Sequence, residues 1–332
     1  MTSPRPPAQP VRRALALGAL ALLAGLAGTP REAAAQAYPN RPITVIIPYA
    51  PGTGIDIAGR IITQKLSEDY GQAIVIRNMP GASGAIGADA AANSTPDGYT
   101  LAMVPNSIFI NQFLKKDSKD PLSVFVPVAP GGTQPYLIAV PPNFAPKNLK
   151  EVAALAKSQP GTLNYTGLSG SVPHFMGVMF AAAADIDIRM VSYKSTTDAI
   201  NDVLTGRVPL WITPLPSGLA FLNSSKVRGL ALTGEKRSPL APDVPTMRES
   251  GFPTMDIDSV LYFVAPRGTP AAIVSKLNAD IARVAATKEI ADKLLGQGLT
   301  VDKRNAQELL EVMRAEQTKW GTIVKASGLK PE

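Results

Sequence analysis

The stretch Ile43-Thr-Val-Ile-Ile-Pro-Tyr49, with the helical pattern after it, decides how the first half of this chain folds. The stretch is short and almost entirely apolar, which is typical of a strand buried on both faces of a sheet. Apolar residues then recur at helical spacing over residues 58–66. The pattern continues with an expected strand at 73–77, an alanine-rich helix at 85–92 and a strand at 99–104. This alternation of strands and helices predicts a parallel sheet.

The same alternation begins again at residue 136. Expected strands lie at 136–140, 163–166, 188–193, 208–212 and 227–232, with helices near 149–157, 173–184, 196–205, 270–286, 288–296 and 305–327. We therefore predict an α/β fold of two lobes, one formed by residues 38–134 and 259–332 and the other by residues 135–258. Small molecules bind in clefts between such lobes and at the carboxyl ends of strands. Residues at the strand ends are therefore the candidates for a functional site.

Length and composition indicate a globular protein. At about 150 residues per domain, 332 residues correspond to two domains. The absence of cysteine excludes disulfides, thiolate chemistry and zinc-thiolate or iron–sulfur sites. A single histidine, His174, cannot form a histidine metal cluster. We therefore expect neither a metal site nor a cofactor.

Residues 1–37 have the pattern of a secretory signal peptide. Arg12 and Arg13 precede an uncharged run at 14–28, and the small residues that follow allow cleavage after Ala35 or Ala37, of which we favour Ala37. The run of 15 uncharged residues is shorter than the ~20 residues that span a bilayer. We therefore expect export to the periplasm, with removal of residues 1–37.

The net charge does not indicate a nucleic-acid partner. Residues 1–37 hold four of the 33 basic and one of the 26 acidic residues, so the net charge of the remaining chain falls from +7 to +4. No block of five like charges occurs.

The loop Pro51-Gly-Thr-Gly-Ile-Asp56 joins the first strand to the first helix. Thr53 and Asp56 have the spacing of a capping box, so their side chains could serve only to cap this helix. The loop could instead bind an anion, because its glycines allow close approach and the helix start favours negative charge. Asp56 would then cap, hold a water, or accept from a ligand amine or hydroxyl rather than face a carboxylate. Ile57 stands where a dinucleotide fingerprint requires its third glycine.

Polar residues also follow later strands. Asn106 and Ser107 come directly after the third strand, where their side chains could form neutral hydrogen bonds with a ligand. Lys194 follows another expected strand and either pairs with a carboxylate or is solvated. Ser195-Thr-Thr-Asp198, which comes next, has the spacing of a second capping box.

The segment Gly167-Leu-Ser-Gly-Ser171 precedes a helix that carries His174 in its first turn. A nucleophile elbow requires glycine where Ser171 stands, so the hydrolase motif is incomplete. A serine hydrolase using Ser169 or Ser171 with His174 remains an alternative, and it would need a carboxylate to orient the imidazole. His174 otherwise lines the cleft or lies at the surface.

Several blocks of the chain, taken in order, resemble the tripartite tricarboxylate transporter substrate-binding proteins of the Bordetella uptake gene (Bug) type. The similarity runs from about residue 38 to residue 329. Its blocks are Tyr-Pro-Asn-Arg-Pro-Ile at 38–43, the loop at 51–56, the glycine-rich turn at 78–87, Pro-Asp-Gly-Tyr-Thr-Leu at 96–101, Ala156-Lys157, Tyr193-Lys194, Pro-Asp-Val-Pro-Thr at 242–246 and Ala-Pro-Arg-Gly-Thr-Pro at 265–270. The resemblance implies a two-lobed periplasmic binding protein of the type II-like Venus flytrap class. Such a protein closes over a small organic carboxylate and delivers it to integral membrane permease subunits.

The chain departs from the family pattern around the expected cleft. Thr53 stands where the family usually has glycine, and Ser192 and Ser195 stand where it has proline and glycine. Val260 and Tyr262 lie near the usual tryptophan and glycine, and Ile-Thr-Pro at 212–214 stands for the common Phe-Asp-Asn. These changes alter the size and polarity of the pocket, so the resemblance does not transfer the identity of a ligand.

We therefore expect a monomeric binding protein that is not an enzyme and has no cofactor, no metal and no nucleic-acid partner. The residues expected to bind the ligand are Tyr49, Gly52, Thr53, Gly54, Ile55, Asp56, Asn106, Ser107, Ser169, Gly170, Ser171, His174, Tyr193, Ser195 and Thr213. Besides the hydrolase, one alternative is a ligand sensor for a membrane signalling receptor, which would have the same cleft and differ in its partner.

Overall fold

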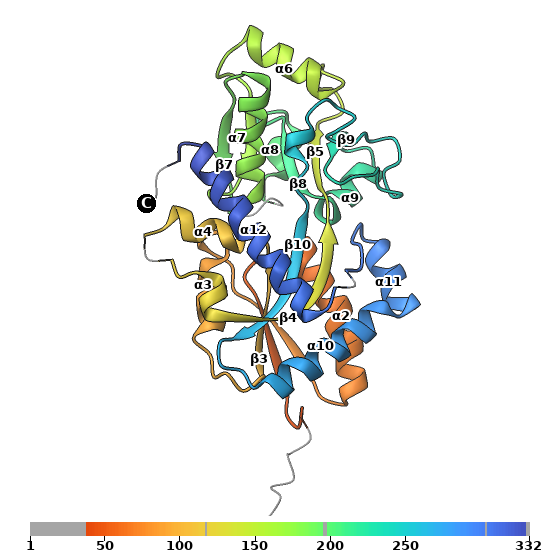
Figure 1. Cartoon of the computed structure of the whole chain (residues 1–332). Helices are drawn as coiled ribbons and strands as arrows, with labels where there is room; N and C mark the ends of the chain where they lie inside the picture. The colour runs from red at the N-terminus through yellow and green to blue at the C-terminus, as the bar shows by residue number, and fades with distance from the viewer. Residues whose placement is uncertain (1–37, 117, 195–197, 303, 330–332) are drawn as a thin grey trace, which may run out of the picture. The chain divides into compact units, whose positions relative to one another are not determined.

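The computed structural model describes residues 38–116, 118–194, 198–302 and 304–329. The expected signal peptide, residues 1–37, lies outside the described residues. All helices and strands below belong to one compact unit that begins at Arg41. They form two groups, each built around strands with helices packed against them (Figure 1).

A five-stranded mixed sheet forms the first group. Its strands are β1 (Ile43–Ile47), β2 (Ile74–Asn78), β3 (Thr100–Pro105), β4 (Phe125–Gln134) and β10 (Ser259–Pro266), in the spatial order β2-β1-β3-β10-β4. Strand β1 is parallel to β2 and β3, as the sequence predicts, with Val45 opposite both Ile76 and Leu101. Strand β10 is antiparallel to β3 and β4 and separates these two strands.

Helices cover this sheet. Helix α2 (Gly54–Tyr70) packs against α10 (Ala271–Ala286) and α11 (Lys288–Leu295). It buries one face at helical spacing and ends at Gly71, which has the left-handed conformation common at helix ends. The remaining helices of this group are α3 (Ala85–Ala92), α4 (Ile108–Leu114), α5 (Pro121–Val124) and α12 (Ala306–Ala326), with a short 3₁₀ turn η1 (Ala82–Gly84) before α3.

The second group contains two smaller sheets. Strand β5 (Tyr136–Val140) lies between β8 (Trp211–Pro214) and β9 (Arg228–Leu232) and is antiparallel to both. Strands β6 (Asn164–Gly167) and β7 (Arg189–Ser192) form a parallel pair. The helices of this group are α6 (Leu149–Ser158), α7 (Val172–Ala184), α8 (Ile200–Leu204) and α9 (Leu215–Asn223), and a 3₁₀ turn η2 (Pro253–Met255) precedes β10.

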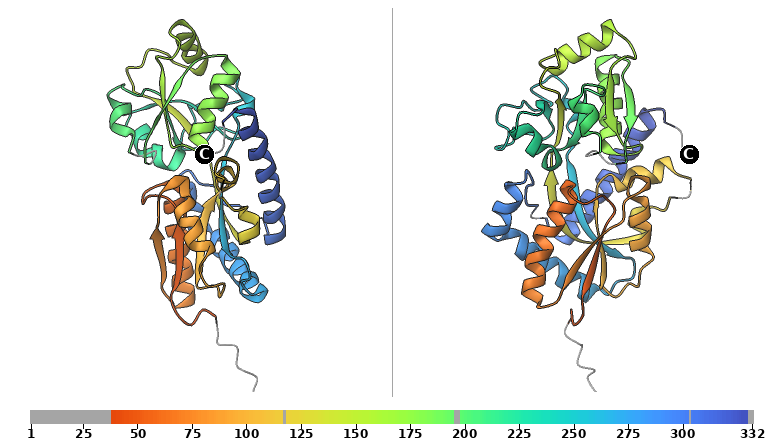
Figure 2. Two further views of the ribbon diagram at one scale, coloured as in Figure 1. Left: turned by 90° about the vertical axis from the view of Figure 1, so that its left-hand side faces the viewer. Right: turned by 180° about the vertical axis from the view of Figure 1, so that it is seen from behind.

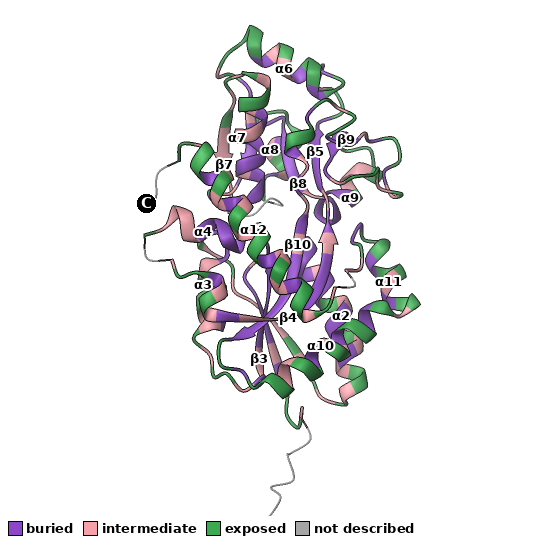
Figure 3. Cartoon of the chain, in the orientation of Figure 1, coloured by how far each residue is buried: buried purple, intermediate pink, exposed green. Residues whose placement is uncertain are grey.

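Three segments connect the two groups. One residue separates the end of β4 at Gln134 from the start of β5 at Tyr136, and the chain returns at Ser259, which lies opposite Gln134. Helix α12 packs on α4 and β4 and runs along both groups (Figure 2). It also reaches α7, where the ring centroids of Trp320 and Phe175 lie 5.9 Å apart. Strands β5, β8 and β10 are buried, whereas α12 has an exposed outer side (Figure 3).

The structure corrects several sequence-based expectations. The strand expected at 208–212 is β8 (Trp211–Pro214), so it ends two residues later. Strands β4 and β10 and helices α4 and α9 were not predicted. The helix expected at 196–205 is observed as α8 (Ile200–Leu204); most of the capping box expected at 195–198 lies outside the described residues.

Replacing Trp320 by alanine is expected to lower the free energy of unfolding by about 3–5 kcal/mol, because the indole is fully buried between the two groups. Trp320→Phe keeps a ring beside Phe175 and should lose less. Urea denaturation followed by circular dichroism measures both. Glu311→Ala, on the exposed side of the same helix, is the control and should change stability by less than about 0.5 kcal/mol. Equal losses for Trp320→Ala and Glu311→Ala would contradict this packing role.

Candidate functional site

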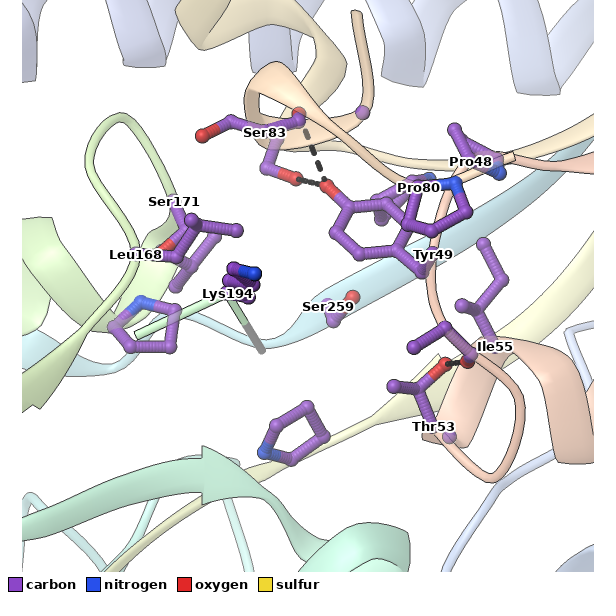
Figure 4. A pocket seen from close by; sticks show the side chains of 18 of the residues that line it. Pro48, Tyr49, Thr53, Ile55, Pro80, Ser83, Leu168, Ser171, Lys194 and Ser259 are labelled. Atoms are coloured by element: carbon purple, nitrogen blue, oxygen red, sulfur yellow. Dashed lines mark hydrogen bonds between the residues drawn. The ribbon is translucent and has the colours of Figure 1, made fainter. Parts of the chain in front are cut away.

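A pocket of about 330 Å³ lies where the two groups meet. Figure 4 shows residues of the second group, including Ser171 and Lys194, across the pocket from Tyr49 and Thr53 of the first group, with Ser259 between them. Much of its wall is apolar, and five prolines contribute to it: Pro48, Pro80, Pro105, Pro173 and Pro214. Prolines have no N–H group, so these positions add contact surface to the pocket without adding donors.

The start of helix α2 forms one side of the pocket, through Thr53, Gly54 and Ile55. The first N–H groups of a helix have no partner within it. The Thr53 hydroxyl does not cap them, because it donates instead to the Ala50 carbonyl over 2.8 Å. The expected capping box is therefore absent, and these N–H groups remain available to an anion in the pocket.

Asp56 lies behind this loop rather than at the pocket surface. It is 2% exposed and accepts hydrogen bonds from Gly52 N at 2.9 Å, Asn78 Nδ2 at 2.9 Å and Arg60 Nε at 3.0 Å. Burial alone would raise the pKa of Asp56, but these hydrogen bonds outweigh it and hold the pKa below its usual value. Asp56 thus stays charged and fixes the loop to β2 and α2.

The start of helix α7 forms the opposite side. Ser171 is the N-cap residue, and its buried hydroxyl has no hydrogen-bond partner among the described residues. Val172 and Pro173 continue this wall, and Lys194 is the only charged side chain among the described residues that line the pocket. Two helix N-termini therefore face the same pocket from opposite sides, and no described Asp or Glu lines it.

A hydrogen-bonded cluster of Tyr49, Ser83 and Ser107 forms a third wall of the pocket. The Tyr49 hydroxyl lies 3.2 Å from Ser107 Oγ and donates to the Ser83 carbonyl over 3.4 Å. Burial raises the pKa of Tyr49, and the hydrogen bond with Ser107 lowers it by less. The hydroxyl therefore keeps its proton. The Ser83 hydroxyl in turn donates to the Ser169 carbonyl, which belongs to the second group. This cluster links the two sides of the pocket directly.

The turn that carries Ser83 has an unusual backbone. Four successive residues have positive φ: Gly81 (136°), Ala82 (48°), Ser83 (56°) and Gly84 (90°). Such conformations cost about 1–3 kcal/mol for a residue with a side chain and persist where the surroundings hold them. Asn111 Nδ2 and Lys115 Nζ donate to carbonyls of this turn over 3.3 and 2.9 Å.

The polar pocket residues that escaped the sequence analysis include Gln134, Tyr136 and Ser259. They stand at the two places where the chain passes between the groups. Burial raises the pKa of Tyr136, and the buried Ser259 hydroxyl has no hydrogen-bond partner among the described residues. Gln134 lies across the start of α2, where a Cβ on Gly54 would collide with Gln134 Oε1. No sequence motif marks these three positions.

The expected site residues divide into three sets. Those that line the pocket are Tyr49, Thr53, Gly54, Ile55, Ser107 and Ser171. Those that do not line it are Gly52, Asp56, Asn106, Ser169, Gly170, His174, Tyr193 and Thr213. Ser195 lies outside the described residues.

Several residues of the second set have other partners. The amide of Asn106 donates to the Asp258 carbonyl and to Glu316. Tyr193 donates to Asp202 over 2.7 Å, and burial together with this carboxylate raises the pKa of Tyr193 to about 12. Thr213 is fully buried in β8.

His174 lies at a separate, small cavity of about 70 Å³ that Ser169 and Gly170 also line. Its Nδ1 accepts from Gly170 N over 3.2 Å, and burial lowers the pKa of His174, which favours the neutral ring. A backbone amide rather than a carboxylate therefore orients the imidazole. Among the described residues, no Asp or Glu is hydrogen-bonded to His174 in the way a serine hydrolase triad requires.

In the part of the chain that the structure describes, no three His, Cys, Asp or Glu residues are arranged to hold a metal ion.

Comparisons with known proteins identify the family. Residues 58–329 match the family model described as tripartite tricarboxylate transporter family receptor. The chain belongs to this receptor family. BugT of Bordetella pertussis is 30% identical over 318 residues, which cover 95% of this chain and 98% of BugT.

Solved structures extend the likeness to the fold. Rpa4515 of R. palustris, a structure with adipate, is 31% identical with a TM-score of 0.84 and covers 89% of this chain and 100% of its own. MatC of Rhodopseudomonas palustris, with bound malate, is 30% identical with a TM-score of 0.79. The match covers 86% of this chain and 100% of the MatC chain. These matches confirm the periplasmic binding protein fold. The family consists of solute receptors, so the expectation of a protein that is not an enzyme is also confirmed.

Replacing Asp56 by asparagine is expected to destabilise this receptor at pH 7 by about 1–3 kcal/mol, since a buried charged acceptor is lost. The pKa of Asp56 is lower in the folded chain than in the unfolded one. Its contribution is therefore complete above the unfolded pKa of about 3.9 and is lost as the pH falls through the folded pKa. The stability gap between the wild type and Asp56→Asn should shrink as the pH falls below about 4.

Urea denaturation at several pH values measures this gap. Asp292→Asn removes a carboxylate from an exposed pair with Lys288 and serves as the control, with an expected change of less than about 0.5 kcal/mol. A gap for Asp56→Asn that stayed constant from pH 7 to pH 3 would show that the charge is not what Asp56 contributes.

Proposed function

We propose that this receptor captures a small organic dicarboxylate with an apolar middle and delivers it to the membrane permease of a tripartite tricarboxylate transporter. The observation that carries the proposal is the pair of helix N-termini, α2 and α7, that face one pocket free of described acidic side chains. Each helix start supplies partial positive charge and unpaired N–H groups. Two such ends on opposite sides match a ligand with two anionic ends.

Charge and surface in the pocket support the same class of ligand. Among the described lining residues, Lys194 supplies the one cationic side chain, and a ligand ammonium group would find no described carboxylate to pair with. The proline-rich wall offers hydrocarbon contact between the two polar sides. Rpa4515 with adipate and MatC with bound malate are relatives whose ligands have two carboxylates and a short carbon chain.

Delivery to a permease requires a location outside the cytoplasm. Residues 1–37 carry the signal-peptide pattern described above, and we propose that they are removed by cleavage after Ala37. No helix in the described ranges is long and apolar enough to cross a membrane. Solved relatives include periplasmic binding proteins such as BugD. We further propose that the receptor works as a monomer.

A calorimetric panel tests the ligand class. The chain from Tyr38 onward is titrated with dicarboxylates of two to four spacer carbons, with matching monocarboxylates, amino acids and sugars. We expect binding of dicarboxylates without chemical change. Lys194→Gln should weaken that binding by about 1 kcal/mol, or roughly fivefold in Kd, and weaken monocarboxylate binding less.

Lys226→Gln, an exposed lysine away from the pocket, is the matched control and should leave the affinity unchanged. Binding confined to sugars, or turnover of any panel member, would refute the proposed function.

The two groups are proposed to act as lobes, residues 38–134 with 259–332 and residues 135–258, that close by a hinge at the crossings. X-ray scattering should show a smaller radius of gyration when ligand is bound. Ser83→Ala removes the hydrogen bond to Ser169 across the pocket, and it should raise the Kd roughly fivefold, the equivalent of about 1 kcal/mol. An unchanged radius at saturating ligand would argue against closure.

A further inference from the structure

The two strand crossings between the groups lie side by side. Gln134 at the end of β4 stands opposite Ser259 at the start of β10, so the sheet of the first group holds the crossings together on its side. Only Pro135 lies between β4 and β5, and the second crossing passes from Asp258 directly into β10. A hinge formed by the crossings is therefore confined to these short links.

The side chain of Thr233 holds the crossings together on the side of the second group. Thr233 directly follows β9 and is 1% exposed. Its hydroxyl accepts from the N–H of Tyr136, the first residue of β5, over 2.8 Å and donates to Asp258 Oδ1 over 2.6 Å. A hydroxyl has a single proton, so this proton is committed to the carboxylate. One side chain thus contacts both crossings at once.

Neighbouring hydrogen bonds keep this bridge in place. The N–H of Thr233 donates to the Tyr136 carbonyl over 2.9 Å, and the N–H of Gly234 donates to Asp256 Oδ1 over 2.6 Å. The segment after β9 is therefore tied to both crossings by its backbone as well. The separation of 2.6 Å between the Thr233 hydroxyl and Asp258 is at the short end of the range for O–H···O hydrogen bonds.

From this bridge we infer that Thr233 is a positioning residue for closure, which couples the two crossings so that the groups turn about one axis. The inference rests on the proposed function, because it concerns the hinge by which the pocket closes over a ligand. Without the hydroxyl, Asp258 loses this donor and the second crossing moves independently of the first. The groups then sample more orientations, of which only a fraction completes the pocket. The affinity falls by that fraction for every ligand alike.

Spin labels on the two groups measure the range of their orientations. Because the chain has no cysteine, Gln64→Cys on α2 and Lys157→Cys on α6, both at exposed positions, can be labelled without background. Double electron–electron resonance then gives the distribution of distances between the groups. Thr233→Val keeps the shape of the side chain and the backbone bond to Tyr136, but it releases Asp258. We expect this variant to broaden the distribution, with and without ligand.

Calorimetry with succinate, glutarate and adipate measures the consequence for binding. Thr233→Val should raise the Kd about three- to tenfold, by the same factor for each acid that the wild type binds. Thr233→Ser, which keeps a hydroxyl, should retain the wild-type Kd and distance distribution. Asp258→Ala breaks the same hydrogen bond from the other side and should reproduce the effect of Thr233→Val, which provides a second variant if the first does not fold.

Thr166→Val is the matched control. Thr166 is fully buried in β6 of the second group, and its hydroxyl accepts from the N–H of Ile212 in β8 over 3.1 Å. Its replacement also removes a buried acceptor from a backbone N–H, so it should lower the midpoint of urea denaturation as Thr233→Val does. The hydroxyl of Thr166 is bonded to β8 rather than to a crossing, so both the distances and the Kd should stay unchanged.

Two results would overturn the inference. One is an unchanged distance distribution in Thr233→Val, which would limit its hydroxyl to a stabilising role like that of Thr166. The other is an equal change of distances and Kd in Thr166→Val, which would trace the effect to lost stability. Failure of the wild type to bind any of the three acids would instead contradict the proposed function, and the distances measured without ligand would still test the role of Thr233.

Discussion

The buried carboxylate of Asp56 fixes the loop on which the pocket depends. It accepts from the Gly52 N–H and is held by Asn78 and Arg60, so it restrains the loop from the side away from the pocket. A carboxylate on the pocket side would neutralise the partial positive charge of α2 and repel an anion. Because Asp56 acts from behind and Thr53 turns its hydroxyl to Ala50, the first turn of the helix keeps its donors for the ligand.

The pocket selects charge mainly with neutral groups. Backbone N–H groups, serine and tyrosine hydroxyls and one glutamine amide surround it, and Lys194 is the one charged side chain among its described lining. Fixed dipoles of this kind do not titrate near neutral pH, so ligand recognition should depend little on the pH of the surroundings. The walls between them are apolar, which strengthens each polar contact once water is excluded.

The sequence predicted the elements whose pattern is local. Strand β1 and helix α2 follow from periodicity because every residue that decides them lies within one short window. Strand β4 was not predicted, since Pro127, Pro130 and two glycines interrupt it and such residues usually end a strand.

The same distinction holds for the site. The start of α2 was recognised from its loop, whereas Gln134 was not, because its position depends on contact with Gly54, which is remote in the chain. Asp56 was placed among the ligand-binding candidates because spacing alone does not tell which side of the loop a carboxylate faces. Its partners Asn78 and Arg60 come from β2 and α2, and only the folded chain brings them together.

The strand order β3-β10-β4 has a consequence for how the molecule assembles. Strand β4 pairs with β10 and with no other named strand, and β10 begins 125 residues after β4 ends, at Ser259 against Gln134. A chain emerging from its N-terminus therefore holds β3 and β4 apart, with edges open, until the whole second group has followed. Such long-range pairing slows folding and leaves an intermediate prone to aggregation. Completion of the pocket and completion of the sheet become the same late event, so an unfinished chain presents no premature binding site.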